Sequence, residues 1–247
     1  MVHRSLTLLT LLCIIALACG CQQRAVISGD QRPVASQPDD TGPVEETPEA
    51  ETPEEPEESS TQAVSPRYAK EAERLAARGQ EALDNGEWLE ANEAFSRAVE
   101  LDRGNIDAWI GRGRVLTGLA QPEDGLVDLD VIDDAVNSFS NAIEIQSDLA
   151  DAWFGRAQAE SVLGRAYFME AGSLGERGMQ ALERAIDDFT QTLALDAENA
   201  EALLGRAEVY EAQGEYEAAI ADFKRVLVQI PGNTTAQMGI DRCRDEM

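Results

Sequence analysis

Few side chains in this chain could carry out acid–base or nucleophilic chemistry. His3 is the only histidine, and it precedes an apolar run that is typical of a removable leader. Loss of this leader would exclude Ser-His-Asp and Cys-His catalysis and zinc sites that contain histidine. No carboxylate pair stands out for hydrolysis, because acidic residues occur throughout the chain. We therefore expect no catalytic, cofactor-binding or metal-binding residues, and we predict that the chain is not an enzyme.

Residues 120–134, within the second repeated block, contain a group of carboxylates. Its members are Glu123, Asp124, Asp128, Asp130, Asp133 and Asp134. A calcium loop needs ligands at alternating positions and a central glycine, but Asp130 is followed by Val131 and Ile132. The spacing therefore argues against a metal site.

The formal net charge of −27 limits the partners that the chain can bind. Binding to nucleic acid depends on Lys and Arg, and so does docking on an anionic membrane surface, so both are disfavoured. The excess of acid favours basic partners, or it serves solubility alone.

The N-terminus predicts export. Arg4 precedes an apolar run over residues 6–18, and small residues follow at Ala18 and Gly20. This order is that of a secretory signal peptide, and the run is shorter than the roughly 20 residues that span a bilayer as a helix. The end of the run, Ala16-Leu17-Ala18-Cys19-Gly20-Cys21, resembles a bacterial lipobox.

That resemblance implies that residues 1–20 are removed and that Cys21 carries a lipid anchor, with Cys19 as the alternative site. The protein would then be exported as a membrane-anchored lipoprotein of the bacterial envelope, on the periplasmic or surface side. Ordinary secretion with an incidental cysteine is the other interpretation. Residues 21–66 are rich in Pro and Glu and poor in apolar side chains, which predicts a disordered acidic linker that acts as a spacer.

Four blocks of the remaining sequence repeat one pattern. Each has an apolar residue, a small residue four places later, and an Ala and a Phe further on. The opening residues are Leu75, Trp109, Trp153 and Leu203, and the aromatic residues are Phe95, Phe139, Phe189 and Phe223. Such a period predicts a solenoid of helix pairs, which usually serves as a binding surface.

The pattern resembles the tetratricopeptide repeat family over residues 72–233. The resemblance implies an all-α, right-handed α-solenoid of about four helix pairs within a domain of residues 67–247. The expected repeats are residues 72–105, 106–149, 150–199 and 200–233, and residues 234–247 form a capping helix in which Met238 and Ile240 face inward. The second and third repeats exceed the family unit by about 10 and about 16 residues, and the helices of the third repeat are expected to be extended.

Family geometry directs two rows of side chains toward a groove for peptides or proteins. The acidic row is Glu73, Asp107, Asp151 and Glu201, and the largely apolar row is Ala76, Ile110, Phe154 and Leu204. An apolar stripe edged with acid suits a basic, partly apolar segment of another protein. The acids could instead simply stabilise helix N-termini. The basic set that grips a C-terminal carboxylate in chaperone-binding members is absent.

One arginine recurs in every block, as Arg78, Arg112, Arg156 and Arg206. We predict that Arg156 pairs with Asp188 and that Arg206 pairs with Asp222 across their hairpins, and anion recognition in the groove is the alternative. The sequence as a whole predicts a lipid-anchored protein–protein interaction module, acting as an adaptor or assembly scaffold and binding no nucleic acid. A self-assembling structural envelope protein is the alternative, although a capping helix argues against open stacking.

Overall fold

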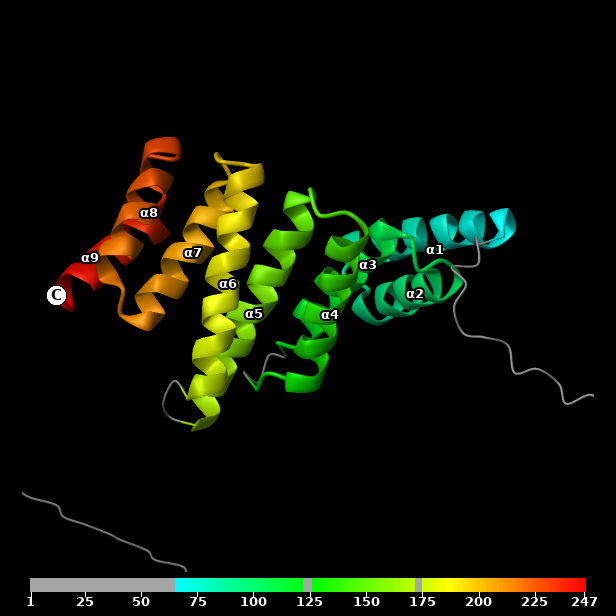
Figure 1. Ribbon diagram of the computed structural model, residues 1–247, viewed down its shortest axis with the longest axis horizontal. Helices are drawn as coiled ribbons and strands as arrows, with labels where there is room; N and C mark the ends of the chain where they lie inside the picture. Colours follow the sequence, from blue (N-terminus) through cyan, green and yellow to red (C-terminus); the bar gives the residue numbers. More distant parts are fainter. Residues whose placement is uncertain (1–64, 122–125, 172–174) are drawn as a thin grey trace, which may run out of the picture. The chain divides into compact units, whose positions relative to one another are not determined.

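A computed structural model describes residues 65–121, 126–171 and 175–247, which belong to one compact unit of residues 58–247. These residues form nine α-helices and no strand (Figure 1). The helices are α1 (Pro66–Asp84), α2 (Trp88–Leu101), α3 (Ile106–Leu119), α4 (Leu129–Ile145), α5 (Ala150–Ala171), α6 (Glu176–Leu195), α7 (Ala200–Gln213), α8 (Tyr216–Gln229) and α9 (Thr234–Asp245). The predicted leader, Cys19, Cys21 and almost all of the linker lie outside the described residues.

The helices pack as hairpins in chain order, and α9 follows the last hairpin (Figure 1). The first helices of neighbouring repeats touch: α1 contacts α3, α3 contacts α5, α5 contacts α7, and α7 contacts α9. Within the described part of the chain, no such contact joins the second helices of neighbouring repeats. The first helices therefore line the inner side of the row. The predicted all-α repeat fold is confirmed.

Local signals set where the helices begin and turn. Asn105, Asn199 and Asn233 cap α3, α7 and α9, and each side chain accepts a hydrogen bond from the backbone N–H three residues later. An asparagine cap is worth about 1 kcal/mol to a helix. Gly86 and Gly214 adopt positive φ values of 77° and 80° where the first and last hairpins turn, a conformation that favours glycine.

The four repeated phenylalanines are buried, and each packs against a glycine of the next repeat. The pairs are Phe95 with Gly111, Phe139 with Gly155, Phe189 with Gly205, and Phe223 with Gly239. A Cβ on these glycines would lie only 2.3, 2.3, 2.5 and 2.4 Å from the nearest ring carbon. The glycines therefore allow consecutive repeats to approach closely.

The inserts lengthen helices. Compared with the 14 residues of α7 and of α8, α4 has 17, α5 has 22 and α6 has 20. The expected extension of both helices in the third repeat is confirmed. In the second repeat, Asp128 caps α4 by accepting hydrogen bonds from the backbone of Asp130 and Val131. Part of that insert, residues 122–125, lies outside the described residues.

The C-terminal helix α9 has the register of a first helix. Ile240 is buried as predicted, but the prediction for Met238 is wrong, because this side chain is 60% exposed. Met238 lies five residues after the capping Asn233, as Leu204 does after Asn199, so it occupies the place of the apolar row.

Candidate functional site: the inner face of the first helices

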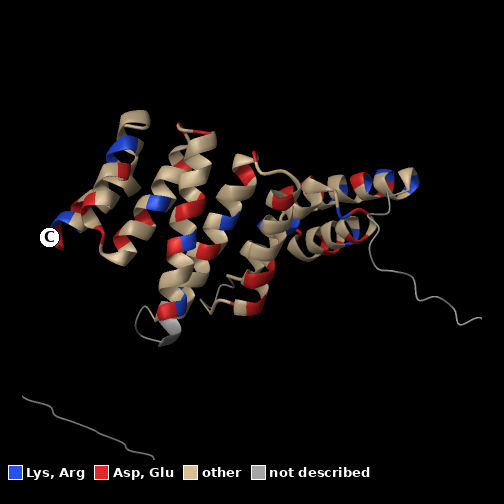
Figure 2. Ribbon diagram, viewed as in Figure 1, with Lys and Arg blue, Asp and Glu red and all other residues tan. Residues whose placement is uncertain are grey.

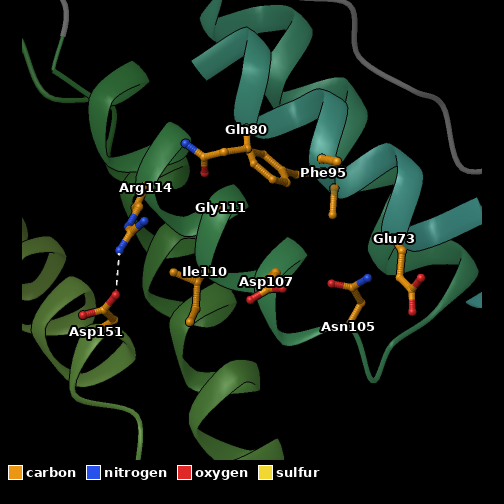
Figure 3. A pocket seen from close by; sticks show the side chains of 11 residues that line it. Glu73, Gln80, Phe95, Asn105, Asp107, Ile110, Gly111, Arg114 and Asp151 are labelled. Carbon is orange, nitrogen blue, oxygen red and sulfur yellow. Dashed lines mark hydrogen bonds and ion pairs between the residues drawn. The ribbon is translucent and has the colours of Figure 1, made fainter. Parts of the chain in front are cut away.

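The first part of the candidate site is a pocket of about 330 Å³ between α1 and α3 that reaches α5. Its lining includes four of the predicted groove residues, which are Glu73, Asp107, Ile110 and Asp151 (Figure 3). Ala76, Ala77 and Gly111 are small residues in the same lining, and the ring of Phe95 also contributes to it. Acidic side chains thus share a hollow with apolar ones.

One acid of this pocket already has a cationic neighbour. Arg114 of α3 reaches across to α5, and its Nη2 lies 3.1 Å from Oδ2 of Asp151 (Figure 3). Glu73 and Asp107 form no ion pair with any residue that the structure describes. The exposed Arg114–Asp151 pair is worth about 1 kcal/mol at most. Glu73 and Asp107 are therefore the acids available to an incoming cation.

A second pocket, of about 270 Å³, continues the inner face between α5 and α7. Phe154 and Glu201 of the predicted groove line it, and Arg165 and Glu208 also contribute. The ring of Phe154 is half-buried, with its centroid 6.0 Å from that of Phe189 at an interplanar angle of 59°. Packing of this kind holds the aromatic side chain in place while leaving part of it accessible.

The structure thus divides the predicted residues between two hollows on the same side of the first helices. Leu204 lines neither pocket and packs, partly buried, against the core of the last two repeats. Ala76 is almost fully buried, which leaves it little accessible surface. The accessible apolar surface of the row comes from the partly buried Ile110, Phe154 and Leu204 and from the exposed Met238.

The recurring arginines lie between helices and have structural partners. Both predicted pairs are confirmed: Arg156 contacts both carboxylate oxygens of Asp188 at 2.7 and 2.9 Å, and Arg206 contacts both of Asp222 at the same distances. The carboxylates are almost fully buried. Hydrogen bonds to them raise the pKa of each guanidinium above its usual range, so the charge is retained.

Three of the four recurring arginines also donate to a hydroxyl of the preceding repeat. Arg112 contacts Ser96, Arg156 contacts Ser140 and Arg206 contacts Thr190, at 3.3, 3.1 and 2.9 Å. In the sequence, these hydroxyl residues directly follow Phe95, Phe139 and Phe189. Arg78 belongs to the first repeat and pairs with Glu90 instead. The arginines therefore tie neighbouring repeats together, and this role supports the structural interpretation over anion recognition.

The described residues contain no group of three or more His, Cys, Asp or Glu side chains that could hold a metal ion. The prediction that residues 120–134 do not form a calcium loop stays a prediction, because residues 122–125 lie outside the described residues. The same described residues include no helix long and apolar enough to cross a membrane.

The fold and these repeated contacts are those of a helical-repeat protein, a class that generally serves protein–protein interaction. The sequence pattern of the tetratricopeptide repeat family matches residues 76–120 and 176–234. The chain is a tetratricopeptide repeat protein. Members of this class generally bind other proteins and are not enzymes, and repeat solenoids present extended surfaces for that purpose.

Solved structures share this fold at low sequence identity. A crystal structure of the MamA protein is 19% identical, with a TM-score of 0.55 over 72% of this chain and 82% of that chain. A thermophilic tetratricopeptide protein of Thermus thermophilus is 17% identical, with a TM-score of 0.53 over 70% and 80%. A tetratricopeptide repeat protein from Parabacteroides merdae is 19% identical, with a TM-score of 0.52 over 72% and 62%. No match was found among curated proteins.

Proposed function

We propose that this chain is an adaptor or assembly scaffold whose inner face binds a basic, partly apolar segment of another protein. The observation that carries the proposal is the pocket between α1 and α3, where Glu73 and Asp107 lie beside Ile110 without an ion-pair partner among the described residues. A lysine or arginine of the partner would meet these carboxylates. An apolar neighbour in the partner would cover Ile110 or Phe154.

The cellular setting belongs to the same proposal and rests on the sequence alone. Arg4, the apolar run over residues 6–18 and the pair Gly20-Cys21 support export and lipid attachment at Cys21, with Cys19 as the alternative. The acidic linker would then hold the repeats away from the bilayer of the bacterial envelope. Mass spectrometry of the mature N-terminus tests this part: a lipid-modified peptide starting at Cys21 or Cys19 supports it, and an unmodified start within residues 22–29 contradicts it.

The C-terminal end of the repeat row favours an adaptor over a self-assembling structural protein. The first helix of each repeat carries a small buried residue four places after its opening apolar residue, and Gly79 and Gly113 face the phenylalanine of their own hairpin. These residues are Gly79, Gly113, Ala157 and Ala207. The equivalent residue of α9 is the exposed Asp241. A further second helix, or another copy, would have to bury this charge, which is costly.

Capture from envelope extracts tests the inner face. The full chain is compared with the double variant Glu73→Lys and Asp107→Lys, and with a control that reverses two exposed acids elsewhere, Glu217→Lys on α8 and Glu144→Lys on α4. We expect the first variant to lose the captured protein and the control to retain it. Equal capture by both variants would contradict the proposed groove. Sedimentation of the full chain separately tests the alternative, because stacking predicts a mass that grows with concentration.

A further inference from the structure

The N-terminal end of the repeat row differs chemically from every junction within it. Where one repeat follows another, the first helix presents a fully buried alanine to the shared core: Ala108, Ala152, Ala202 and Ala236. The equivalent residue of α1 is Arg74, whose side chain is 64% exposed. No helix of the described residues covers this end. Glu71 occupies the place that the capping asparagines hold in α3, α7 and α9, but α1 already begins at Pro66, five residues earlier.

Cationic side chains gather at this end, although the chain as a whole has a net charge of −27. Arg67, Lys70 and Arg74 lie on α1, and they line one recess together with Arg97 of α2. Figure 2 shows blue bands along α1, interspersed with red ones. Arg74 and Arg97 have exposed partners on their own helices, Glu71 at 2.5 Å and Glu100 at 2.6 Å. Exposed pairs of this kind are weak. Arg67 and Lys70 form no ion pair with a described residue, and the positive end of the α1 dipole adds to their field.

These cations surround a recess that has an apolar floor. Its volume is about 740 Å³, and the apolar side chains in its lining are Tyr68, Leu75 and Leu101. Tyr68 is 53% exposed, whereas Leu75 and Leu101 are half-buried against the core of the first hairpin. An exposed aromatic residue beside an apolar recess is a usual anchor point for a protein partner. The recess has room for a large side chain held between charged neighbours.

We propose that this basic end, defined by Arg67, Tyr68, Lys70, Arg74 and Arg97, binds an acidic peptide segment of a second protein that carries an aromatic or large aliphatic residue. Carboxylates of the segment would contact the guanidinium groups, and its apolar side chain would enter the recess beside Tyr68. The chain would then join two proteins of opposite character, a basic segment on the inner face and an acidic one at this end.

A membrane surface fits this end less well than a peptide. Each cation near an anionic bilayer contributes about 1 kcal/mol, but the large negative charge of the chain opposes approach to such a surface. A flat layer of headgroups also leaves a recess of this volume unfilled, whereas a protruding side chain fills it. The peptide is therefore the occupant that the charges and the recess together favour.

Fluorescence anisotropy of the full chain with short labelled peptides tests the proposal. The probe is a run of glutamates around one phenylalanine. One comparison peptide replaces the glutamates with lysines, and another replaces the phenylalanine with alanine. We expect the probe to bind and the alanine peptide to bind more weakly. Binding of the lysine peptide to the inner face should be unaffected by Arg67→Glu with Lys70→Glu and should be lost in Glu73→Lys with Asp107→Lys. The double variant Arg67→Glu and Lys70→Glu should weaken probe binding by about tenfold or more.

Matched variants decide whether binding occurs at this end. Lys224→Glu removes an exposed cation on α8 and should leave probe affinity unchanged, whereas Tyr68→Ala should lower it. The variant Glu73→Lys with Asp107→Lys should retain probe binding, which separates this proposal from the inner-face groove. Two results would overturn the proposal: an equal loss in Lys224→Glu and in the Arg67 and Lys70 variant, or binding of phosphatidylglycerol vesicles through Arg67 and Lys70 without binding of the peptide.

Discussion

Arg156 of α5 holds both carboxylate oxygens of Asp188 on α6, with Nε donating at 2.7 Å and Nη2 at 2.9 Å. The carboxylate side chain is 6% exposed and the guanidinium is 22% exposed. The same arginine donates through Nη1 to Ser140 on the preceding repeat. One side chain thus fixes a hairpin and also its junction with its neighbour.

We predict that Arg156→Ala destabilises the fold by about 3 kcal/mol, because it leaves the buried Asp188 without a partner. Asp188→Ala should lower the free energy of unfolding by less, since water can still hydrate the partly exposed guanidinium of Arg156. Arg97→Ala is the control, because its pair with Glu100 is exposed on both sides and such pairs contribute little. Urea unfolding of the three variants gives the comparison. Equal stability of Arg156→Ala and Arg97→Ala would refute the assignment.

Gly155→Ala tests the close approach between the second and third repeats. The new Cβ would lie 2.3 Å from the ring of Phe139, which is buried and cannot move aside freely. Overpacking of a core costs about 1–3 kcal/mol. Gly232→Ala is the matched control, because nothing lies within 4 Å of its Cβ position. The thermal midpoint should fall for the first variant and stay close to that of the parent for the second.

Binding at the inner face should weaken as ionic strength rises. Glu73, Asp107 and Glu201 have no ion-pair partner among the described residues, so their field acts on an approaching cation until salt screens it. We expect the association rate with a captured basic partner to fall between low and physiological salt. Glu73→Lys with Asp107→Lys should remove most of that dependence. Surface plasmon resonance at several salt concentrations measures it, and a rate that does not change with salt would argue against electrostatic steering.

Cys243 should be unreactive in the folded chain. It lies on α9 with its side chain fully buried in the core of the last repeat, and burial raises the pKa of the thiol. Because the thiolate is then favoured only in the unfolded chain, the contribution of this residue to stability falls as the pH rises above the thiol's unfolded pKa. Mass spectrometry after iodoacetamide treatment should find this cysteine modified only in denaturant. Rapid modification under native conditions would show that α9 opens.

The sequence was sufficient to predict the helix pairs, the terminal helix and two ion pairs, because these depend on residue types at short, repeated spacings. Arg156 with Asp188 and Arg206 with Asp222 were predictable since charge and spacing recur together. The hydroxyl partners were missed, because Ser and Thr are common in many settings. Gly155 and Gly205 were not recognised as contact points, since their partners Phe139 and Phe189 belong to the preceding repeat.

The wrong prediction for Met238 has a physical reason. Apolar residues of a terminal helix are usually expected to face the core, but α9 keeps the register of α7. The capping Asn233 therefore places Met238 in the row of Ile110, Phe154 and Leu204. The sequence also could not show that Arg114 reaches Asp151, because that contact depends on how far neighbouring repeats rotate relative to each other.

Phe154→Ala should weaken binding of the partner to the inner face, because desolvated aromatic residues often contribute about 2 kcal/mol or more to an interface. The ring also packs on Phe189, so part of the effect would be on stability. The thermal midpoint of the variant is therefore measured beside its affinity. Weaker binding by a fully folded chain supports the role of Phe154, and unchanged binding would move the contact elsewhere, for example toward Tyr167 of the extended hairpin.

Site-specific photo-crosslinking tests the central claim, binding at the inner face, most directly. A photoreactive amino acid is placed at position 77, where the exposed Ala77 lines the pocket between α1 and α3, and separately at position 228, where Val228 is 82% exposed on α8. Both side chains are exposed, so a larger residue has room at either position. Illumination of cells should join a second protein to the chain through position 77 and not through position 228. Crosslinks through position 228 alone would contradict the account.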